Sequence, residues 1–306
     1  MSKTAIDTSV APVTRPALLA GLAIAVAGAI LFSTKAIVAK LLYRYHMDAV
    51  TLIAFRMLFS LPVFAGVAIW KMRTEAPLQA RDRWRLVGLG LIGYYLSSYL
   101  DFLGLQYISV GLERLILFLT PTFVLLLTSA VFKRRIGGAQ WGALGLSYCG
   151  ILLVFVHDLT GGTGSIVTGS LFVLGSALSY AIYLLGTGEM VRRIGSLRLV
   201  AYAMCVSSVA CIAQFFILRP ASLLIQPWPV YGLSLVNGIF CTIFPVFMTM
   251  IAVQRIGAAT ASQAGMIGPV STLFLGWALL GEPITAIQLA GTALVVAGIY
   301  MLSLKK

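Results

Sequence analysis

The sequence predicts an all-α polytopic membrane protein with ten transmembrane helices, arranged as two inverted-topology repeats of five helices and with both termini cytoplasmic. Three observations predict this fold: the composition, a series of long apolar runs, and an internal repeat. Of the 306 residues, 60 % are hydrophobic and 10 % are charged, and the mean hydropathy is +0.99. These values lie far outside the usual balance of soluble domains.

The net charge of +13 could indicate a nucleic-acid-binding protein, but the cations lie in short loops between apolar runs and not on a soluble basic face. We therefore expect no nucleic-acid partner. The cysteines lie inside apolar runs without CxxC spacing, so they are expected to be small core residues and not disulfides or metal ligands; they are Cys149, Cys205, Cys211 and Cys241. No metal or cofactor is predicted.

Each membrane-spanning helix needs about 20 mostly apolar residues. After a polar cytoplasmic tail at 1–16, the predicted helices occupy residues 18–42, 49–70, 86–105, 111–132, 138–157, 169–188, 199–218, 230–253, 257–280 and 284–304. The first run is too long for the core of a signal peptide and is expected to be retained. The runs are continuously apolar, which argues against the alternating strands of a membrane barrel.

Lysine and arginine in the short loops predict the orientation. The connection KMRTEAPLQARDRWR at 71–85, the KRR triplet at 133–135 and the C-terminal Lys305–Lys306 pair all fall on one side if ten helices are drawn. The opposite loops are nearly free of cations, apart from Arg44 and Arg219. This side is therefore predicted to be cytoplasmic, in a multi-pass protein of the inner (plasma) membrane.

The second half of the chain repeats the first at an offset of 148 residues. QYISVGLERLILFLTPTF lies over QRIGAATASQAGMIGPVS, and the matched positions include Gln106 with Gln254, Pro121 with Pro269 and Gly150 with Gly298. Because each half holds five helices, an odd number, the halves enter the membrane from opposite sides and the repeat is inverted. The predicted units are residues 17–157 and 169–304, joined by an outer loop at 158–168. Inverted repeats are a common plan of secondary transporters.

Several motifs resemble one transporter family. GAILFSTKAIVAK, LIAFRMLFSLP and the hairpin WALLGEPITAIQLAGTALVVAGI are similar to the EamA-type branch of the drug/metabolite transporter superfamily, and within it to YddG-type exporters of aromatic amino acids. The resemblance implies a secondary transporter. One departure is that Phe32 and Ser33 stand where many members carry Trp-Gly, which removes the basis for transferring a role to that position.

Five charged residues fall within the outer half of the first repeat, where an unpaired charge costs about 3 kcal/mol or more. They are Lys35, Arg56, Asp101, Glu113 and Arg114. Two interpretations stay open: an outer gate or substrate-orienting cluster, and a static ion-pair network between helices. The second half is uncharged at Thr249, Ala261 and Ser262, which align with Asp101, Glu113 and Arg114, and close to Ala203, where Arg56 would fall. Whatever role the charges have is thus confined to one side.

Prolines, aromatic residues and one glutamine supply the candidate substrate cavity. A proline in mid-helix bends the helix and frees backbone carbonyls, and mid-membrane tyrosines need hydroxyl partners inside the bundle. The candidates are Tyr95, Tyr99, Phe118, Pro121, Tyr180, Tyr183, Phe244, Gln263 and Pro269. Tyr95 and Tyr99 are expected to share one helix face because they are four residues apart. A purely structural bend at each proline is the alternative.

The residues favour a transporter over an enzyme. The two histidines, His46 and His157, lie at predicted helix ends and join no cluster of acids or cysteines, and no Walker sequence indicates direct use of ATP. No carboxylate is expected at the membrane midplane, which favours facilitated diffusion or exchange. The predicted function is export of small amphipathic metabolites, foremost aromatic or neutral amino acids, through a midplane cavity, with a monomer sufficient. Proton-coupled efflux of drugs or lipophilic cations and a membrane-embedded enzyme are the alternatives.

Overall fold

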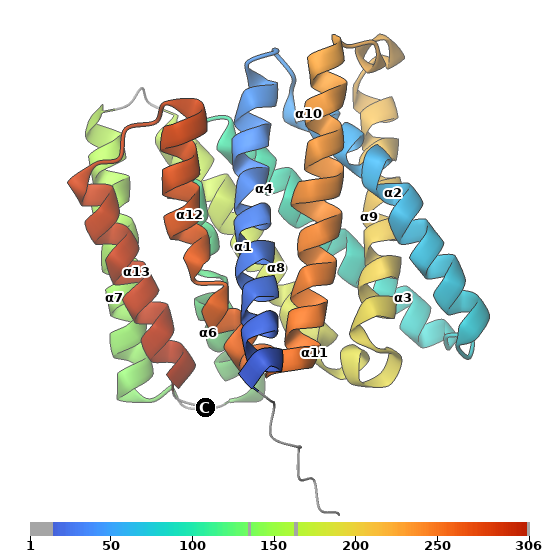
Figure 1. The fold of residues 1–306 in the computed structure, drawn as a ribbon, viewed down its shortest axis with the longest axis horizontal. Helices are drawn as coiled ribbons and strands as arrows, with labels where there is room; N and C mark the ends of the chain where they lie inside the picture. Colours follow the sequence, from blue (N-terminus) through green and yellow to red (C-terminus); the bar gives the residue numbers. More distant parts are fainter. Residues whose placement is uncertain (1–14, 134–135, 162–164, 305–306) are drawn as a thin grey trace, which may run out of the picture.

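The computed structural model describes residues 15–133, 136–161 and 165–304, and in this part of the chain ten helical passes lie side by side (Figure 1). The first five passes are α1 (Arg15–Tyr43), α2 (Ala49–Thr74), α3 (Ala80–Gly90) continued by a π-helical turn (Leu91–Leu96) and α4 (Ser97–Leu105), α5 (Val110–Leu117) with α6 (Thr120–Phe132), and α7 (Gly138–Gly161). The all-helical membrane fold predicted from the apolar runs is confirmed.

The second five passes repeat this order. They are α8 (Ile166–Ile194), α9 (Ser196–Leu218), α10 (Trp228–Gly238) continued by a π-helical turn (Ile239–Ile243) and the first part of α11 (Phe244–Ala264), the end of α11 with α12 (Ile267–Leu275) and a π-helical turn (Gly276–Leu280), and α13 (Ala286–Leu304). α11 reverses direction at Gly257, which has φ 78° and ψ 158°. A residue without a Cβ suits this turn because φ is positive.

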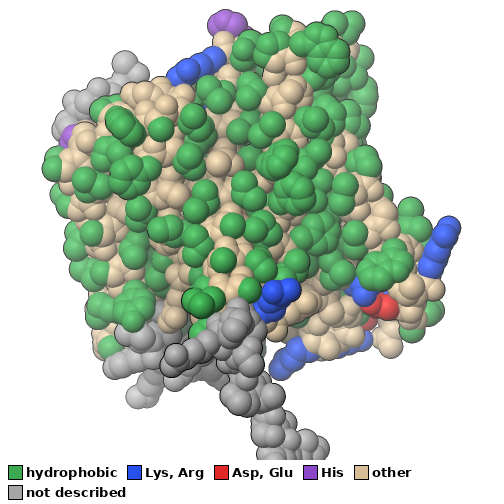
Figure 2. Space-filling model, in the orientation of Figure 1, with side chains coloured by type: hydrophobic (Ala, Val, Ile, Leu, Met, Phe, Trp, Pro, Cys, Tyr) green, Lys and Arg blue, Asp and Glu red, His purple; other side chains and the backbone are tan. Residues whose placement is uncertain are grey.

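Eight helices among the described residues are long and apolar enough to span a membrane, and two shorter apolar segments, Ile267–Leu280 and Ala286–Met301, complete the bundle. Large hydrophobic side chains cover the face in Figure 2 through its height, while charged side chains gather at its lower edge and upper rim. Such a surface suits a lipid environment, because soluble proteins rarely expose apolar patches of this extent.

α1 begins and α13 ends at the same face of the bundle, the lower one in Figure 1, which we name the termini face. The other end is named the opposite face. Which face lies in the cytoplasm stays a prediction. Most of the expected polar tail, the cations at 134 and 135, the middle of the expected outer loop and the C-terminal lysine pair lie outside the described residues.

The two halves carry the same backbone irregularities 148 residues apart. The π-helical turn that begins at Leu91 has its counterpart at Ile239, and the left-handed residue Lys133 (φ 52°) has its counterpart at Gly281 (φ 74°). The fourth pass breaks after Leu117 and the ninth after Ala264. Each break lies about four residues before a proline, Pro121 or Pro269, where the ring excludes the carbonyl of the preceding turn.

Helix packing follows the same pseudo-symmetry. α1 packs on α11 as α8 packs on α4, and α7 pairs with α13 at one side of the bundle (Figure 1). A Cβ placed on Gly150 would meet the backbone carbonyl of Gly291, and one on Gly298 would meet that of Ala143; the repeat relates these two contacts to each other. Small residues thus bring the two helices together, as is usual in membranes. The inverted five-plus-five arrangement is therefore present in the packing as well as in the sequence.

Candidate functional site

Five charged side chains meet in the half of the bundle nearer the opposite face. We name them the buried charge cluster: Lys35 of α1, Arg56 of α2, Asp101 of α4, and Glu113 and Arg114 of α5. Each exposes no more than 6 % of its surface. Because an isolated charge is costly in this environment, the sequence of the first repeat can place these residues here only if they support one another.

Lys35 is the centre of the cluster. Its ammonium group donates a hydrogen bond to Asp101 Oδ2 and lies 3.9 Å from Glu113 Oε1. Neither carboxylate oxygen of Glu113 has a hydrogen-bond partner among the described residues, and the same is true of Asp101 Oδ1. One ammonium therefore serves two carboxylates, and it is bonded to only one of them.

Hydroxyl groups hold the two arginines and connect them to the second repeat. Arg56 Nε donates to Thr242 Oγ1 at 2.7 Å, and Arg114 Nη2 donates to Ser33 Oγ at 2.7 Å. Ser33 in turn lies 3.1 Å from the carbonyl oxygen of Gly268, where α12 begins, and accepts a hydrogen bond from Ser271 at 3.1 Å. The cluster thus bridges the halves, although all five charges belong to the first.

Two phenylalanine rings lie between the cations. Phe102, fully buried, has the Lys35 ammonium 5.4 Å and the Arg56 guanidinium 5.3 Å from its ring centre. Phe32 has Lys35 at 5.2 Å and Arg114 at 4.9 Å, and it keeps 38 % of its surface exposed. Cations near an aromatic face are attracted by its quadrupole. Phe32 is therefore the exposed part of an otherwise buried network.

The two proline-associated helix breaks meet beside this network. A Cβ placed on Gly268 would lie 3.4 Å from the Phe118 ring, so the broken fourth and ninth passes approach each other there. Pro269 is buried at this junction, whereas Pro121 is exposed. Gln263, in the last turn of α11, is half-buried.

The predicted tyrosines divide into two groups. Tyr180 and Tyr183 of α8 stack at 5.5 Å and meet Tyr94, which is not among the predicted cavity residues; the Tyr94 and Tyr183 rings are 5.0 Å apart and their hydroxyls 3.4 Å apart. We name these three the tyrosine cluster. Tyr95 and Tyr99 do share one face, with rings 6.5 Å apart and nearly parallel, but Tyr99 packs toward α2 and α9.

Phe244, the remaining aromatic candidate, is 43 % exposed and lies edge-on to Phe240 at 5.2 Å. These contacts therefore divide the nine cavity candidates into several groups. Phe118 and Pro269 lie at the helix breaks, beside the Gly268 position that approaches Ser33. A substrate role for each of the nine stays a prediction.

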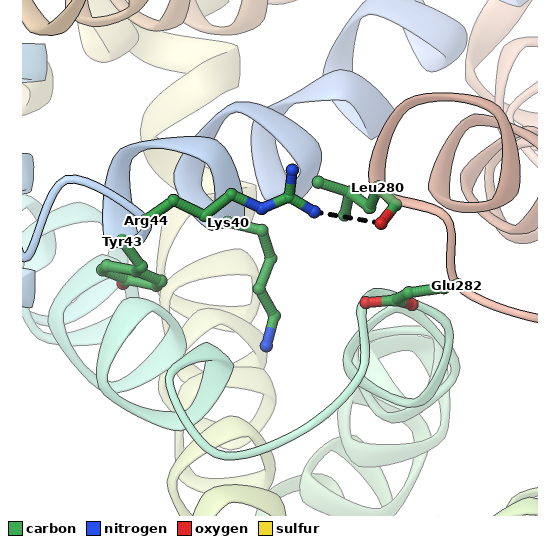
Figure 3. A pocket seen from close by; sticks show the side chains of 5 residues that line it. All are labelled: Lys40, Tyr43, Arg44, Leu280 and Glu282. Carbon is green, nitrogen blue, oxygen red and sulfur yellow. Dashed lines mark hydrogen bonds between the residues drawn. The ribbon is translucent and has the colours of Figure 1, made fainter.

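Two cavities open at opposite faces. The larger, about 880 Å³, lies toward the termini face between the third, fourth and sixth passes, and Arg192 and Phe132 are among its lining residues. The smaller, about 320 Å³, is lined by Lys40, Tyr43, Arg44, Leu280 and Glu282 (Figure 3). Arg44 and Leu280 lie 148 residues from Arg192 and Phe132, so the two cavities occupy pseudo-symmetric positions and differ in volume.

In the smaller cavity, Lys40 of α1 and Arg44, which directly follows α1, face one carboxylate from the hairpin before α13 (Figure 3). Arg44 Nη2 donates to the carbonyl oxygen of Leu280 at 3.0 Å. The Glu282 carboxylate accepts a hydrogen bond from the backbone N–H of Val110, the first residue of α5, and burial raises the pKa of Glu282 above its usual value. The hairpin thus closes over the start of the fourth pass.

The two carboxylates that the sequence places near the outer ends of their helices are buried in the bundle. Asp101 is 2 % exposed and Glu113 is 0 % exposed. Sequence position gave only their depth along each helix, whereas packing of α1, α4 and α5 encloses them from the sides. Among the described residues, no three His, Cys, Asp or Glu side chains form a group that could hold a metal ion.

Sequence reasoning missed four residues that contact the cluster: Ser33, Thr242, Phe102 and the ring of Phe32. The hydroxyls lie in the other repeat or one turn away and carry no sequence signal that separates them from other membrane serines and threonines. Phe32 does carry a sequence signal, because it precedes Lys35 by three residues and therefore lies on the same helix face.

The comparisons with known proteins agree with this architecture. The model of the EamA-like transporter family matches residues 19–156 and again residues 167–304. The chain is 30 % identical over 275 residues to the uncharacterized transporter YcbK of Bacillus subtilis (strain 168), covering 86 % of each chain. It is 24 % identical over 262 residues to an uncharacterized transporter of Archaeoglobus fulgidus, covering 85 % of this chain and 90 % of that one. A solved crystal structure at 16 % identity superposes with a TM-score of 0.65 over 94 % of this chain and 97 % of the other, which shows the fold alone.

Proposed function

The chain belongs to the EamA-like transporter family of the drug/metabolite transporter superfamily, and from its site we propose that it exports small amphipathic metabolites, foremost aromatic and neutral amino acids. It is a multi-pass membrane transporter and not an enzyme. The substrate, the direction and the membrane belong to the proposal: export across the inner (plasma) membrane, with the termini face in the cytoplasm and a monomer as the working unit.

One observation carries the substrate proposal. The cations Lys35 and Arg114 lie near the ring of Phe32, which is 38 % exposed, and Lys35 also contacts the buried carboxylates of Asp101 and Glu113. A zwitterionic amino acid presents a carboxylate and an ammonium group next to its side chain, so it needs partners of both signs and a surface for that side chain. An aromatic side chain gains most from a ring that it can stack on.

The paired cavities support alternating access. They lie at pseudo-symmetric positions at opposite faces, yet one measures about 880 Å³ and the other about 320 Å³. Exchange of the conformations of the two repeats would exchange the open side. The larger cavity lies at the face that the cationic loops favour as cytoplasmic, which suits loading of a substrate for export.

Exchange in proteoliposomes tests this function. Vesicles loaded with unlabelled phenylalanine should take up labelled phenylalanine at equal pH, and uptake should saturate and fall when tryptophan is added outside. Phenethylamine and 3-phenylpropanoate are matched competitors, because each keeps the ring and only one charge. We expect both to compete less than phenylalanine does.

A second candidate function follows from the Glu113 carboxylate, which accepts no hydrogen bond among the described residues and would suit a lipophilic cation. Exchange of labelled tetraphenylphosphonium, with no uptake of phenylalanine or tryptophan, would overturn the amino-acid proposal and favour this second function.

A further inference from the structure

We infer that the smaller cavity is a second, outer substrate site, in which Lys40 and Arg44 bind the carboxylate of an amino acid and Glu282 binds its ammonium group. The inference rests on the proposed transport of amino acids and adds a binding site at the opposite face. It starts from one observation: the Lys40 ammonium and the Glu282 carboxylate face the same cavity without forming an ion pair (Figure 3).

The Lys40 ammonium supplies most of the hydrogen-bond donors of this site. Lys40 lies in the last turn of α1 and is half-buried, yet it makes no hydrogen bond or ion pair within the part of the chain that the structure describes. Arg44 uses one nitrogen, Nη2, for the carbonyl oxygen of Leu280. Because a partly buried ammonium group without its own acceptor is costly, an anionic group that enters the cavity would be stabilised there.

Glu282 supplies the negative side of the cavity. The backbone N–H of Val110 holds its carboxylate on the hairpin before α13, apart from the two cations of the α1 end (Figure 3). A bare anion would be attracted by Lys40 and Arg44 but repelled by Glu282. A zwitterion satisfies both signs at once, with its carboxylate toward the cations and its ammonium group toward Glu282. The arrangement of charges therefore favours an amino acid over a simple anion.

The cavity lies between the buried charge cluster and the opposite face. Lys40 is five residues beyond Lys35 in α1, or about 7.5 Å along the helix axis. Tyr43, which also lines the cavity, donates a hydrogen bond to the carbonyl oxygen of Phe102 at 2.6 Å, and the Phe102 ring contacts the cluster. The volume of about 320 Å³ is at the lower end of small-molecule sites, which measure about 300–1,000 Å³. A substrate that leaves the cluster toward the opposite face would thus meet this cavity.

The second repeat does not copy this site. At the offset of 148, Gly188 stands at the position of Lys40, and Arg134 stands in the sequence at the position of Glu282. Gly188 lines the larger cavity, which therefore has no counterpart of the Lys40 ammonium. The pairing of both charge signs belongs to the smaller cavity, so binding of an amino acid at this site is expected at the opposite face only.

Protection of an introduced thiol tests the inference. Leu280→Cys places a thiol in the cavity lining and leaves the three charged side chains in place, and a membrane-impermeant maleimide should label it from the opposite face. Labelling of the wild type gives the background from the native cysteines. Phenylalanine should slow the labelling of Leu280→Cys, and about tenfold more phenylalanine should be needed for the same protection when Lys40→Met is added. Lys40→Arg should keep the protection. Arg219→Gln is the matched control, because it removes a cation at the same face that pairs with Asp48 outside the cavity; it should leave the protection unchanged.

Analogues with a single charge separate the two signs and keep the test decisive if Lys40→Met does not fold. Glu282→Gln keeps an oxygen acceptor for the Val110 N–H, and it should weaken protection by phenylalanine and phenethylamine but not by 3-phenylpropanoate. Lys40→Met should weaken protection by phenylalanine and 3-phenylpropanoate but not by phenethylamine. Equal protection by acetate and phenylalanine would show a general anion site and overturn the inference, as would protection that neither substitution changes.

Exchange measured on the same proteins separates this inference from the proposed function. Phenylalanine exchange by the wild type and by Leu280→Cys, without any protection of the thiol, would overturn the outer site and leave the transport function intact. Absence of phenylalanine exchange in the wild type would instead overturn the proposed function.

Discussion

The pseudo-two-fold relates two regions with the same backbone and different chemistry: the buried charge cluster toward the opposite face and the tyrosine cluster toward the termini face. At the offset of 148, Lys35 corresponds to Tyr183, Phe32 to Tyr180, and Thr242 to Tyr94. Ions and cation–π contacts hold the helices together in one region, and stacked rings with a single hydroxyl contact do so in the other. The fold therefore determines where the transmembrane helices meet, but it does not determine which side-chain interactions hold them together there.

The backbone has the same irregularity in both regions. Each cluster adjoins a π-helical turn, which leaves carbonyl oxygens without their usual partner. Near the tyrosine cluster, Ser179 Oγ donates to the Ile92 carbonyl at 2.7 Å, and near the charge cluster Thr242 Oγ1 donates to the Asn237 carbonyl at 2.8 Å. A side-chain hydroxyl thus adds a hydrogen bond to one carbonyl at each turn. The two regions therefore share their backbone geometry, and only substitutions in the buried charge cluster should change stability through the loss of a charge.

Removing Lys35 should produce the largest difference in stability between the two regions. Lys35→Met leaves the carboxylates of Asp101 and Glu113 buried without their shared ammonium, and we expect a loss of about 3–5 kcal/mol in the free energy of unfolding. Tyr183→Phe at the corresponding position removes one hydroxyl contact and should cost about 1 kcal/mol or less. Unfolding of both variants in detergent micelles, followed by circular dichroism, measures the difference.

Neutralising a carboxylate should partly restore the Lys35→Met variant, so Lys35→Met with Asp101→Asn is expected to be more stable than Lys35→Met alone. Equal losses for Lys35→Met and Tyr183→Phe would contradict the view that the two regions are held together differently.

Substituting Gly93, which lies beside the tyrosine cluster, should reduce stability by a smaller amount. A Cβ on Gly93 would lie 2.2 Å from Tyr183 Cγ, so Gly93→Ala must displace the ring and should cost about 1–3 kcal/mol. Its counterpart in the charge region is Cys241, which already carries a side chain and lies 3.0 Å from Thr34 Oγ1. The ring of Tyr183 therefore requires glycine where the slimmer side chain of Lys35 does not.

Gly66→Ala is the control for Gly93→Ala, since nothing lies within 4 Å of its added Cβ and helix propensity favours alanine. Thermal unfolding should show a loss for Gly93→Ala, no loss for Gly66→Ala, and recovery when Gly93→Ala is combined with Tyr183→Ala. An equal melting temperature for the wild type and Gly93→Ala would show that the ring contact contributes nothing.

The sequence predicts the fold better than it predicts the side-chain contacts. Apolar length and the matched prolines gave the ten passes and the inverted repeat, because both depend on the membrane thickness and on backbone geometry. The cost of intramembrane charge singled out the five residues that meet in the buried charge cluster. Their role as a gate or a clamp stays a prediction.

Tyr94 shows why the contacts are harder to predict. Four-residue spacing correctly placed Tyr95 and Tyr99 on one face. The π-helical turn at Leu91–Leu96 shifts the helical phase, however, and Tyr94 is the residue that meets Tyr180 and Tyr183. No pattern in the sequence marks such a turn, and spacing counted along an ideal α-helix cannot follow it.

The smallest predicted effect compares the starts of α2 and α9, which begin at equivalent turns. Asp48 caps α2 by accepting hydrogen bonds from the Val50 and Thr51 N–H groups at 2.9 and 3.3 Å, whereas Gly195 precedes α9 with φ 79° and no side-chain cap. Asp48→Ala should therefore lower the free energy of unfolding by about 1 kcal/mol. Ser196→Ala, at the start of α9, should change it little.

The same cap gives a pH dependence with a definite sign. Burial pushes the pKa of Asp48 upward, but hydrogen bonds from Thr51 and the charge of Arg219 outweigh it and hold the pKa below its usual value. A lowered pKa in the folded state stabilises the protein above the unfolded value of about 3.9, and this contribution is lost as the pH falls through the folded value. The stability difference between the wild type and Asp48→Asn should thus be constant from about pH 8 to about pH 5 and shrink below about pH 4. Melting temperatures of the two proteins across this range measure it, and a difference that persists unchanged to about pH 3 would show that the ionised form of Asp48 adds nothing to the cap.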